Sequence, residues 1–286
     1  MGAANPEIIK RRVKIDFESA QTNPWSARGA AFENKLNVLS FLFPAGERFF
    51  INSVRNYLPR VTDPVLREQA EQFIYQEAMH TKEHTRSNLV LAADLPYGPA
   101  MDRLAKTMLA FHTRTSFKAS QLAVTCAMEH FTAILADDLL RRQDEFRAAA
   151  DPAFATLWLW HAVEETEHKA VCFDVYEHVF GKGFFSYLHR VVMMAMTTLV
   201  VALTMGIGFR IVARGERKKD GASSTPAPAR PTLSSLMRSI SGRLYFDYYR
   251  RSFHPWDHDN SDLVAQWKRN YADLGVQPTK VKQLAS

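Results

Sequence analysis

The chain of 286 residues contains only two cysteines, Cys126 and Cys172. Both lie in apolar segments with helical spacing, which argues against a disulfide framework and favours a reducing compartment. Residues 1–10 lack the apolar run of a signal peptide, so export by the general secretory route is not expected. We therefore expect the protein in the cytoplasm.

The alternation of polar and apolar residues that marks half-buried strands is missing from the sequence. Apolar positions instead recur with helical spacing, and Asp63-Pro64 and Asp151-Pro152 read as the N-cap and first residue of two helices. The predicted fold class is therefore all-α. We predict helices over about 41–58, with Pro44 in its first turn, and over 63–93, 100–112, 116–142 and 151–180, the last ended by Gly181 and Gly183.

Four regions are expected along the chain. They are an irregular lead-in (1–30), a helical bundle (31–189), an apolar helix (190–212) and a basic linker with amphipathic C-terminal helices (213–286). Within the last region we expect a flexible linker over 214–232, an amphipathic segment over 233–253, and a short helix over 262–274 capped by Ser261.

The apolar helix is open to several interpretations. Residues 191–209 carry no charge, and this length is at the lower end of a membrane span. The segment past Ala213 holds 13 of the 36 Lys and Arg residues but only 7 of the 30 Asp and Glu residues. A basic tail beside an apolar helix suggests anionic lipid, and no nucleic-acid-binding module is recognisable. The helix could span a membrane, lie on its inner face, be buried, or form half of a homodimer interface.

The stretch 158–169 places polar groups inside an apolar helical pattern. His161, Glu165 and His168 are related by four and three residues, so all three project from one side of a helix. Burying a carboxylate and two imidazoles costs several kcal/mol unless a partner compensates them. A divalent cation is such a partner.

Similar groups recur on three other predicted helices. Glu47 lies on the first, Glu77-x-x-His80 on the second, Glu129 on the third, and Glu165-x-x-His168 on the fourth. One Glu on each of two helices and Glu-x-x-His on each of the other two is the ligand set of ferritin-like di-iron carboxylate bundles. The sequence thus predicts a ferritin-like four-helix bundle with a di-metal carboxylate core. The candidate catalytic and metal-binding residues are Glu47, Glu77, His80, Glu129, His161, Glu165 and His168, with His84 as a possible further ligand.

Some of these residues also have simpler interpretations. Glu47 could begin a helix, where the dipole favours a carboxylate, and Glu129 could lie at the surface. His84 is either a further ligand or a hydrogen-bonded core histidine, whereas we favour a ligand role for His161. The nearby acidic residues Glu83, Glu164 and Glu167 are expected to be solvated.

Around these positions the chain resembles the family of predicted metal-dependent hydrolases, over most of residues 10–270. The resemblance is carried by Phe43-Pro-Ala-Gly-Glu47, Gln76-Glu77-x-x-His80-x-x-x-His84, Glu129-His130-Phe-Thr-Ala and Trp160-His161-x-x-Glu164-Glu165-x-Glu167-His168-Lys169. The His161-x-x-x-Glu165-x-x-His168 spacing is more distantly similar to that of di-iron arylamine N-oxygenases, a resemblance that implies His161 as an additional ligand. The chain departs from that group in His84 and in its apolar helix with a basic tail.

Two metal ions are the expected cofactors, iron first, with manganese or zinc as alternatives. The preferred hypothesis is a di-iron oxidoreductase that takes O₂, an electron donor and an organic, possibly lipid-like, substrate, because histidine and carboxylate donors suit iron and O₂ chemistry. The alternative is a metal-dependent hydrolase whose nucleophile is a hydroxide held by two metal ions. A non-enzymatic metal-binding protein is the third hypothesis.

Overall fold

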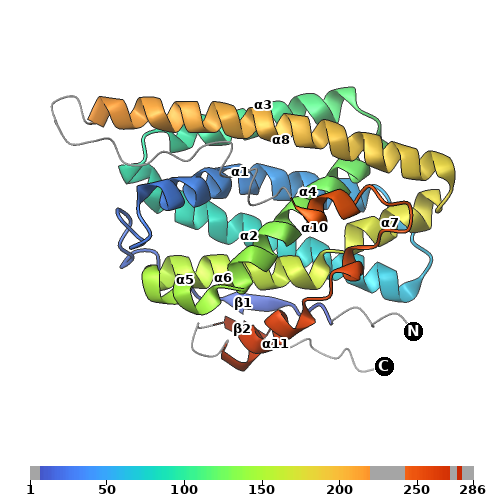
Figure 1. The fold of residues 1–286 in the computed structure, drawn as a ribbon, viewed down its shortest axis with the longest axis horizontal. Coiled ribbons are helices and arrows are strands. Elements are labelled where there is room, and N and C mark those ends of the chain that lie inside the picture. Colours follow the sequence, from blue (N-terminus) through green and yellow to red (C-terminus); the bar gives the residue numbers. More distant parts are fainter. Residues whose placement is uncertain (1–6, 220–241, 271–275, 279–286) are drawn as a thin grey trace.

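Four helices lie side by side at the centre of the fold (Figure 1). They are α1 (Ala30–Arg55), α2 (Pro64–Asp94), α4 (Lys118–Leu140) and α6 (Pro152–His168). In this computed structural model, which describes residues 7–219, 242–270 and 276–278, α1 packs mainly against α2, and α4 packs mainly against α6. The predicted all-α helical bundle is confirmed.

Asp-Pro pairs begin two of the four central helices. The Asp63 carboxylate accepts hydrogen bonds from the backbone N–H groups of Val65 and Leu66, and that of Asp151 accepts one from Ala153. Each following proline occupies the first helical position, where its missing N–H leaves no hydrogen bond unmade. Both predicted helix starts are confirmed.

Helix α1 begins at Ala30, well before the predicted start, and Pro44 lies in its interior. A proline inside a helix leaves the carbonyl four residues earlier without its N–H partner. This carbonyl belongs to Ser40, and it accepts a hydrogen bond of 2.7 Å from the side-chain Nδ2 of Asn88 on α2. The donor from the neighbouring helix compensates the lost hydrogen bond, so α1 continues through the proline to Arg55 and carries Glu47 in its second half.

The helix that carries the central stretch is shorter than predicted. Helix α6 ends at His168, and the chain resumes as α7 (Val171–Phe180), which ends at Gly181 as expected, with a φ of 74°. Between the two helices, Lys169 Nζ donates a hydrogen bond of 2.6 Å to the carbonyl of His258. The turn after α6 is therefore attached to the C-terminal segment.

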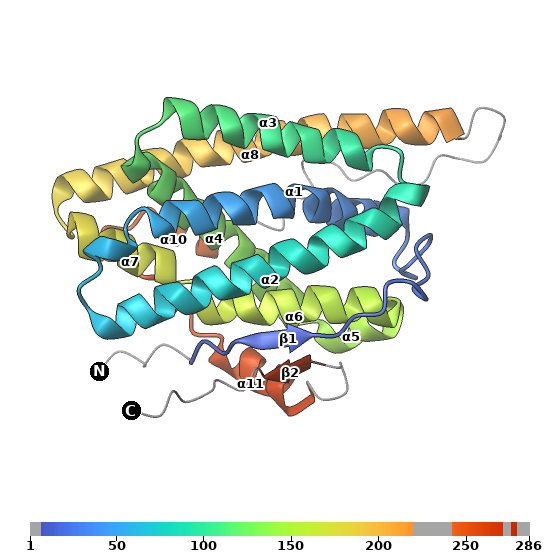
Figure 2. The ribbon, with the colours of Figure 1, turned by 180° about the vertical axis from the view of Figure 1, so that it is seen from behind.

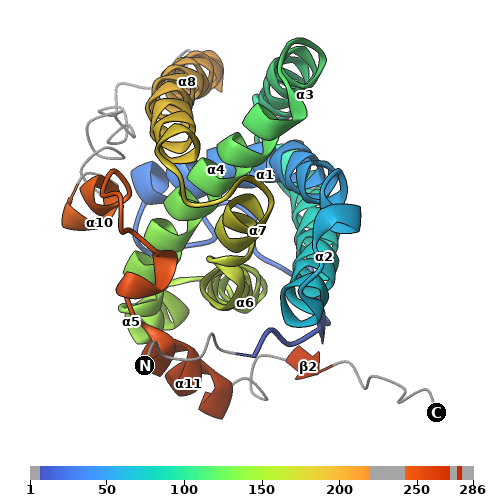
Figure 3. The ribbon, with the colours of Figure 1, turned by 90° about the vertical axis from the view of Figure 1, so that its right-hand side faces the viewer.

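The long apolar helix α8 (Phe184–Lys219) lies beside α3 (Gly98–Thr115) on one side of the bundle (Figure 3). It extends the predicted apolar helix at both ends and takes in residues 214–219, which were expected in the linker. One face of α8, including Met194 and Met205, is buried against the bundle, and contacts connect α8 with α4, α1 and α3.

The C-terminal segment returns to the bundle. It contains α10 (Arg243–Asp247), the 3-10 turn η2 (Pro255–Asp257) and α11 (Ser261–Asn270), and α11 contacts α6. Residues 220–241 and 271–275, which hold much of the predicted linker and amphipathic segment, lie outside the described residues. The described residues also include two further helical elements, η1 (Leu58–Arg60) and α5 (Gln143–Ala149).

Two short strands also form, although the sequence predicted none. Strands β1 (Arg11–Val13) and β2 (Val276–Pro278) pair antiparallel, with Arg12 opposite Gln277. Figure 2 shows the pair below α2 and α6, next to α11. A strand of three residues is too short to show an alternating pattern, so it gives no sequence signal. The pairing joins the predicted lead-in to the C-terminal segment. Residues Ile9 and Arg11 of the lead-in also contact α2 and α6, which carry the candidate site.

The apolar core consists of two clusters of buried side chains. One is built around Trp25, Phe154 and Trp160, and the other around Phe73 and Tyr176. The second also contains both cysteines, which are buried and free, so the expected absence of a disulfide between them agrees with the structure.

Candidate metal centre

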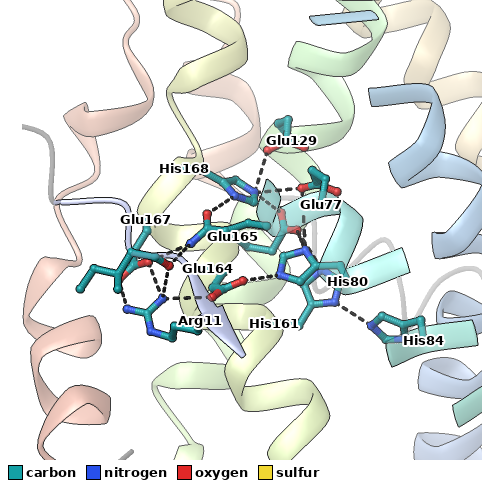
Figure 4. A network of polar contacts seen from close by, with 12 residues as sticks. Arg11, Glu77, His80, His84, Glu129, His161, Glu164, Glu165, Glu167 and His168 are labelled. Atoms are coloured by element: carbon teal, nitrogen blue, oxygen red, sulfur yellow. Dashed lines mark hydrogen bonds and ion pairs between the residues drawn. The ribbon is translucent and has the colours of Figure 1, made fainter. Parts of the chain in front are cut away.

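Seven predicted ligand residues converge at one buried place inside the bundle, and Figure 4 shows most of them. None is more than 4% exposed. Their donor atoms form overlapping groups in which all atoms lie within 4.8 Å of one another. The residues come from four helices: Glu47 from α1, Glu77 and His80 from α2, Glu129 from α4, and His161, Glu165 and His168 from α6.

The first group contains three carboxylates around one imidazole. His168 Nε2 lies 3.2 Å from Glu77 Oε1, 3.3 Å from Glu129 Oε2 and 3.6 Å from Glu165 Oε2. The other ring nitrogen, Nδ1, is 2.9 Å from Gln76 Oε1, which can only accept a hydrogen bond. When His168 is neutral, its proton therefore sits on Nδ1 and Nε2 is the atom that can bind a metal. In the metal-free site burial favours this neutral form, but the neighbouring Glu129 and Glu165 outweigh it and raise the pKa of His168 well above its usual range.

The second group shares two carboxylates with the first. Glu77 and Glu165 each belong to a group with His80 as well, so they lie between the two halves of the site. His80 Nε2 is 3.1 Å from Glu164 Oε2, while its Nδ1 is 3.8 Å from Glu77 Oε1 and 3.7 Å from Glu165 Oε1. When Glu164 is ionised, this hydrogen bond keeps the proton of His80 on Nε2 and leaves Nδ1 as the atom that can bind a metal. Glu47 and His161 complete this half.

His84 has partners at both ring nitrogens. Its Nε2 is 2.7 Å from His161 Nδ1, and its Nδ1 is 2.8 Å from Ser40 Oγ. His161 in turn places Nε2 2.8 Å from Glu165 Oε1. His84 therefore fits the role of a residue that orients His161, although it also forms a possible three-ligand group with Glu47 and His161.

Many donor atoms in this site lack a hydrogen-bond partner of acceptable geometry among the described residues. A buried polar atom without such a partner costs about 1–3 kcal/mol, and more when it is charged. Because these atoms face one another, one or two cations would satisfy them together, and the residues present fit a metal centre. The atoms are both carboxylate oxygens of Glu47, Glu77 and Glu129, Oε2 of Glu165, Nδ1 of His80 and Nε2 of His168.

Burial sets the protonation of the metal-free site. Burial and the neighbouring carboxylates raise the pKa of Glu47 and Glu77 well above the usual range, and the pKa of Glu129 to about 7. Burial and the neighbouring His161 lower the pKa of His80, so this imidazole is neutral, as a metal ligand must be. Burial also disfavours the Glu165 anion, but the charge on His168 outweighs it and lowers the pKa of Glu165. The carboxylates cannot all ionise together without added cations.

A second buried network supports the site from outside. Arg11 on β1 is 3% exposed and places its guanidinium nitrogens 3.1 Å from Glu164 Oε1 and 2.6 Å from Glu167 Oε1. Lys268 on α11 lies 2.9 Å from the same Glu167 oxygen. Gln76 Nε2 donates to Glu167 Oε2 at 3.2 Å, which fixes the orientation of the amide that holds His168. The network thus positions the imidazoles of His80 and His168.

The expectation that three acidic residues are solvated was wrong. Glu83, Glu164 and Glu167 are at most 2% exposed. Glu83 pairs with Arg86 at 2.6 Å, and the other two pair with Arg11. Helix α6 is buried on all sides from Phe154 to His168, so its acidic residues require partners whichever way they point.

Arg11 is the functional residue that sequence reasoning missed. It lies in a polar lead-in about 150 residues from its partners, and nothing local marks it as buried. The usable signal was the charge on α6: a helix with Trp-Leu-Trp at its centre and acidic residues on several faces demands buried cations from elsewhere.

A cavity of about 230 Å³ opens to the metal centre at His161 and Glu165. Its wall is mostly apolar and comes from α1, α4 and α6, with Leu39, Phe43 and Trp158 among the lining residues. Basic side chains line it as well.

A family model described as "predicted metal-dependent hydrolase" matches residues 9–259 of the chain. No curated protein and no solved structure matches it. The matched range contains all seven converging residues and Arg11, so the match covers the metal centre and most of the surrounding network.

Proposed function

The chain belongs to the family of predicted metal-dependent hydrolases, and from this premise we propose that it is an enzyme whose central helices bind two metal ions. The observation that carries the proposal is the set of inward-facing buried donor atoms that lack hydrogen-bond partners among the described residues. Four carboxylates balance the charge of two divalent cations, so the complete set is neutral when the imidazoles are neutral.

The two groups of donors suggest how the ions are shared. In the proposal, Glu129 and His168 bind one ion, and Glu47, His80 and His161 bind the other. Glu77 and Glu165 belong to groups in both halves and could be shared by the two ions, which would make seven ligand residues in all. Counted per ion, with the two shared carboxylates included, one ion would have four protein ligands and the other five. The set has no thiolate, a common ligand of structural zinc sites. Nitrogen and oxygen donors in this number suit iron or manganese.

Hydrolysis is the reaction that family membership supports. Two bound metal ions would lower the pKa of a water and polarise the bond to be cleaved. The protein's own residues hold the imidazoles in their ligating tautomers through Gln76 and Glu164. The aromatic rings of Phe43 and Phe73 pack against His161 and His168 and limit the water that reaches the centre.

Oxidation of an organic substrate by O₂ is the second candidate. The observation in its favour is the placement of Glu-x-x-His on α2 and on α6, opposite single glutamates on α1 and α4, as in di-iron carboxylate bundles. The same centre would then hold two irons and require an electron donor. The ligand set is compatible with both reactions. Measurements of the bound metal and of the reaction catalysed are needed to distinguish them.

Metal analysis tests the proposal. Protein loaded with Fe(II) without oxygen, or with Mn(II) or Zn(II), should hold two ions per chain by mass spectrometry, and Glu77→Gln and His168→Ala should hold fewer. Glu71→Ala is the matched control, because Glu71 is an exposed glutamate on the same helix. A wild-type protein that binds no metal under any loading would refute the two-metal centre.

Turnover then identifies the reaction class. Hydrolysis of ester or phosphate substrates that is independent of O₂ supports the first candidate. O₂ consumption by the di-iron form with a reductant, together with a new visible absorption band, supports the second.

Helix α8 supports a proposal about location. Among the described residues it is the one helix long and apolar enough to cross a membrane by length and composition, and 22% of its most apolar window is buried inside the structure. Most of its exposed large apolar side chains recur every three or four residues and form a stripe, and Phe184 and Val200 beside the stripe are exposed as well; the stripe consists of Phe185, Leu188, Val192, Met196, Leu199, Leu203 and Ile207.

The stripe ends in exposed basic residues, Arg210 and Arg214, and α3 beside it exposes Arg103 and Arg114. Because the opposite face of α8 is buried in the bundle, we propose that the stripe lies on an anionic membrane surface on the cytoplasmic side rather than crossing it. Flotation with vesicles containing phosphatidylglycerol should recover the wild type, and Leu199→Glu should lose this binding without a change in melting temperature. A dimer that Leu199→Glu dissociates, without vesicle binding, would overturn the proposal.

A further inference from the structure

The cavity beside the metal centre runs along the helices that carry the metal ligands. On α1, the lining residues Lys35, Leu39 and Phe43 are spaced four apart, and the next position in this row is Glu47. Residues spaced four apart lie on one helix face, so the cavity and the ligand share a face of α1. The cavity therefore begins among polar side chains and ends at His161 and Glu165 of the metal centre.

One end of the cavity carries more positive than negative charge, because Arg28, Lys35 and Arg142 line it with Asp138 as the carboxylate beside them. Lys35 is half-buried and forms no ion pair or hydrogen bond with the described residues. Burial lowers its pKa, which reflects the cost of holding this ammonium group away from water. Arg28 also lines the cavity and stacks over Phe32, with the guanidinium carbon 4.2 Å from the ring centre. Arg142, in contrast, is paired with Asp138.

Most of the remaining wall, between this end and the metal centre, is apolar. Leu36 and Leu39 on α1, Leu135 and Leu139 on α4, and Trp158 on α6 face the cavity. Such a wall favours a hydrocarbon part, while the unpaired ammonium requires an anion to offset its charge. Since Asp138 pairs with Arg142, the positive charges of Lys35 and Arg28 remain, and the two oxygens of one carboxylate can pair with both.

We propose that this cavity binds the substrate, and that the substrate is a single-chain amphipathic carboxylate whose carboxylate pairs with Lys35 and Arg28 while its apolar chain extends toward Glu165. The inference rests on the proposed function only in calling the ligand a substrate. Lys35 and Glu47 are twelve positions apart on α1, which corresponds to about 18 Å along the helix axis. A medium-length alkyl chain therefore spans from the head group toward the metals, and the reacting carbon is remote from the carboxylate.

Calorimetric titration with decanoate and with decanol tests the assignment, because the two ligands differ mainly in charge. Decanoate should bind the metal-loaded wild type about ten-fold or more tightly than decanol. Lys35→Met should reduce decanoate affinity toward that of decanol, with Arg28 retaining part of the preference, and leave decanol unchanged, whereas Lys35→Arg should retain the full preference. Lys14→Met is the matched control, because Lys14 is exposed and does not line the cavity.

A second variant guards against simple misfolding. Leu135→Trp keeps Lys35 but fills the apolar part of the cavity, so it should weaken both ligands while the melting temperature confirms that the protein is folded. Equal affinity of the wild type for decanoate and decanol, or no effect of Lys35→Met, overturns the proposal. Tighter binding of decyl phosphate than of decanoate overturns the head-group assignment.

Metal content measured on the same samples separates this inference from the proposed function. The titration requires no turnover. A protein that binds the carboxylate but takes up no metal on loading would therefore refute the metal centre alone. Two bound metals without carboxylate binding would refute the cavity assignment alone.

Discussion

Replacing Arg11 with Met removes the buried cation that Glu164 and Glu167 share. The guanidinium makes contacts of 3.1, 2.7 and 2.6 Å with these two carboxylates, and all three side chains are at most 3% exposed. Methionine fills similar space without charge, so the change isolates the electrostatic contribution. Breaking a buried pair from one side costs about 3–5 kcal/mol, because it leaves an uncompensated buried charge.

The structure places the expected cost of Arg11→Met at the lower end of this range. Glu167 keeps Lys268 at 2.9 Å and Gln76 at 3.2 Å, and Glu164 keeps His80 at 3.1 Å. We expect a loss of about 3 kcal/mol. For a chain of this size each kcal/mol lowers the melting temperature by about 2–4 °C, so the variant should melt roughly 6–12 °C lower.

The pH dependence of this deficit provides a second readout. Burial raises the pKa of Glu164 to about 8 even with Arg11 present, whereas for Glu167 the bond to Arg11 outweighs burial and lowers the pKa. Without Arg11, the pKa of both carboxyl groups should rise, more for Glu164 than for Glu167, which keeps Lys268. A carboxyl group with a raised pKa adds stability below its unfolded pKa and loses it as the pH rises through the folded pKa. The deficit should therefore be largest above pH 8 and shrink toward about pH 5.

Thermal unfolding followed by circular dichroism measures both effects, with metal-free protein to remove the contribution of bound ions. Arg12→Met is the matched control, because Arg12 is the exposed neighbour on the same strand and should change the melting temperature little. A loss of less than 1 kcal/mol for Arg11→Met, or a deficit that grows as the pH falls, would refute the reasoning.

Three other changes test the supporting contacts. Gln76→Leu removes the acceptor that orients His168, and competition with a chelator should show metal affinity about 10–100-fold weaker in a folded protein. In the wild type, metal affinity should fall about ten-fold per pH unit below pH 7 for each proton released, because Glu129 then carries a proton that the metal must displace; pH-independent affinity would contradict this. Asn88→Leu leaves the Ser40 carbonyl beside Pro44 without a donor and should lower the unfolding free energy by about 1–3 kcal/mol in urea titrations.

The centre of the fold could be predicted from local patterns. The Asp63-Pro64 and Asp151-Pro152 caps mark two helix starts directly, because an N-cap and its proline act within a few residues. The spacing of Glu77 and His80, and of Glu165 and His168, likewise follows from helix geometry alone. That these four residues meet Glu47 and Glu129 was predicted from the ligand set of di-iron carboxylate bundles, in which each of four helices supplies a glutamate.

What failed depended on contacts between distant segments. Pro44 looked like a helix start because the donor that allows it inside α1, Asn88, lies on another helix. Glu164 and Glu167 looked solvated because Arg11 reaches them through tertiary packing. Short strands such as β1 have no pattern of their own, and their pairing comes from segments at opposite ends of the sequence.

That pairing bears on the order in which the protein matures. Glu167 needs both Arg11 and Lys268, so its surroundings are assembled only after the ribosome has made α11. Until then, the acidic residues of α6 in the nascent chain can pair with Arg11 but not with Lys268. Strand β1 likewise has no β2 to pair with. The bundle can begin to fold during synthesis. The contacts around Glu167 are complete only after α11 has been made, so we expect the metal ions to enter the finished site after the chain is released.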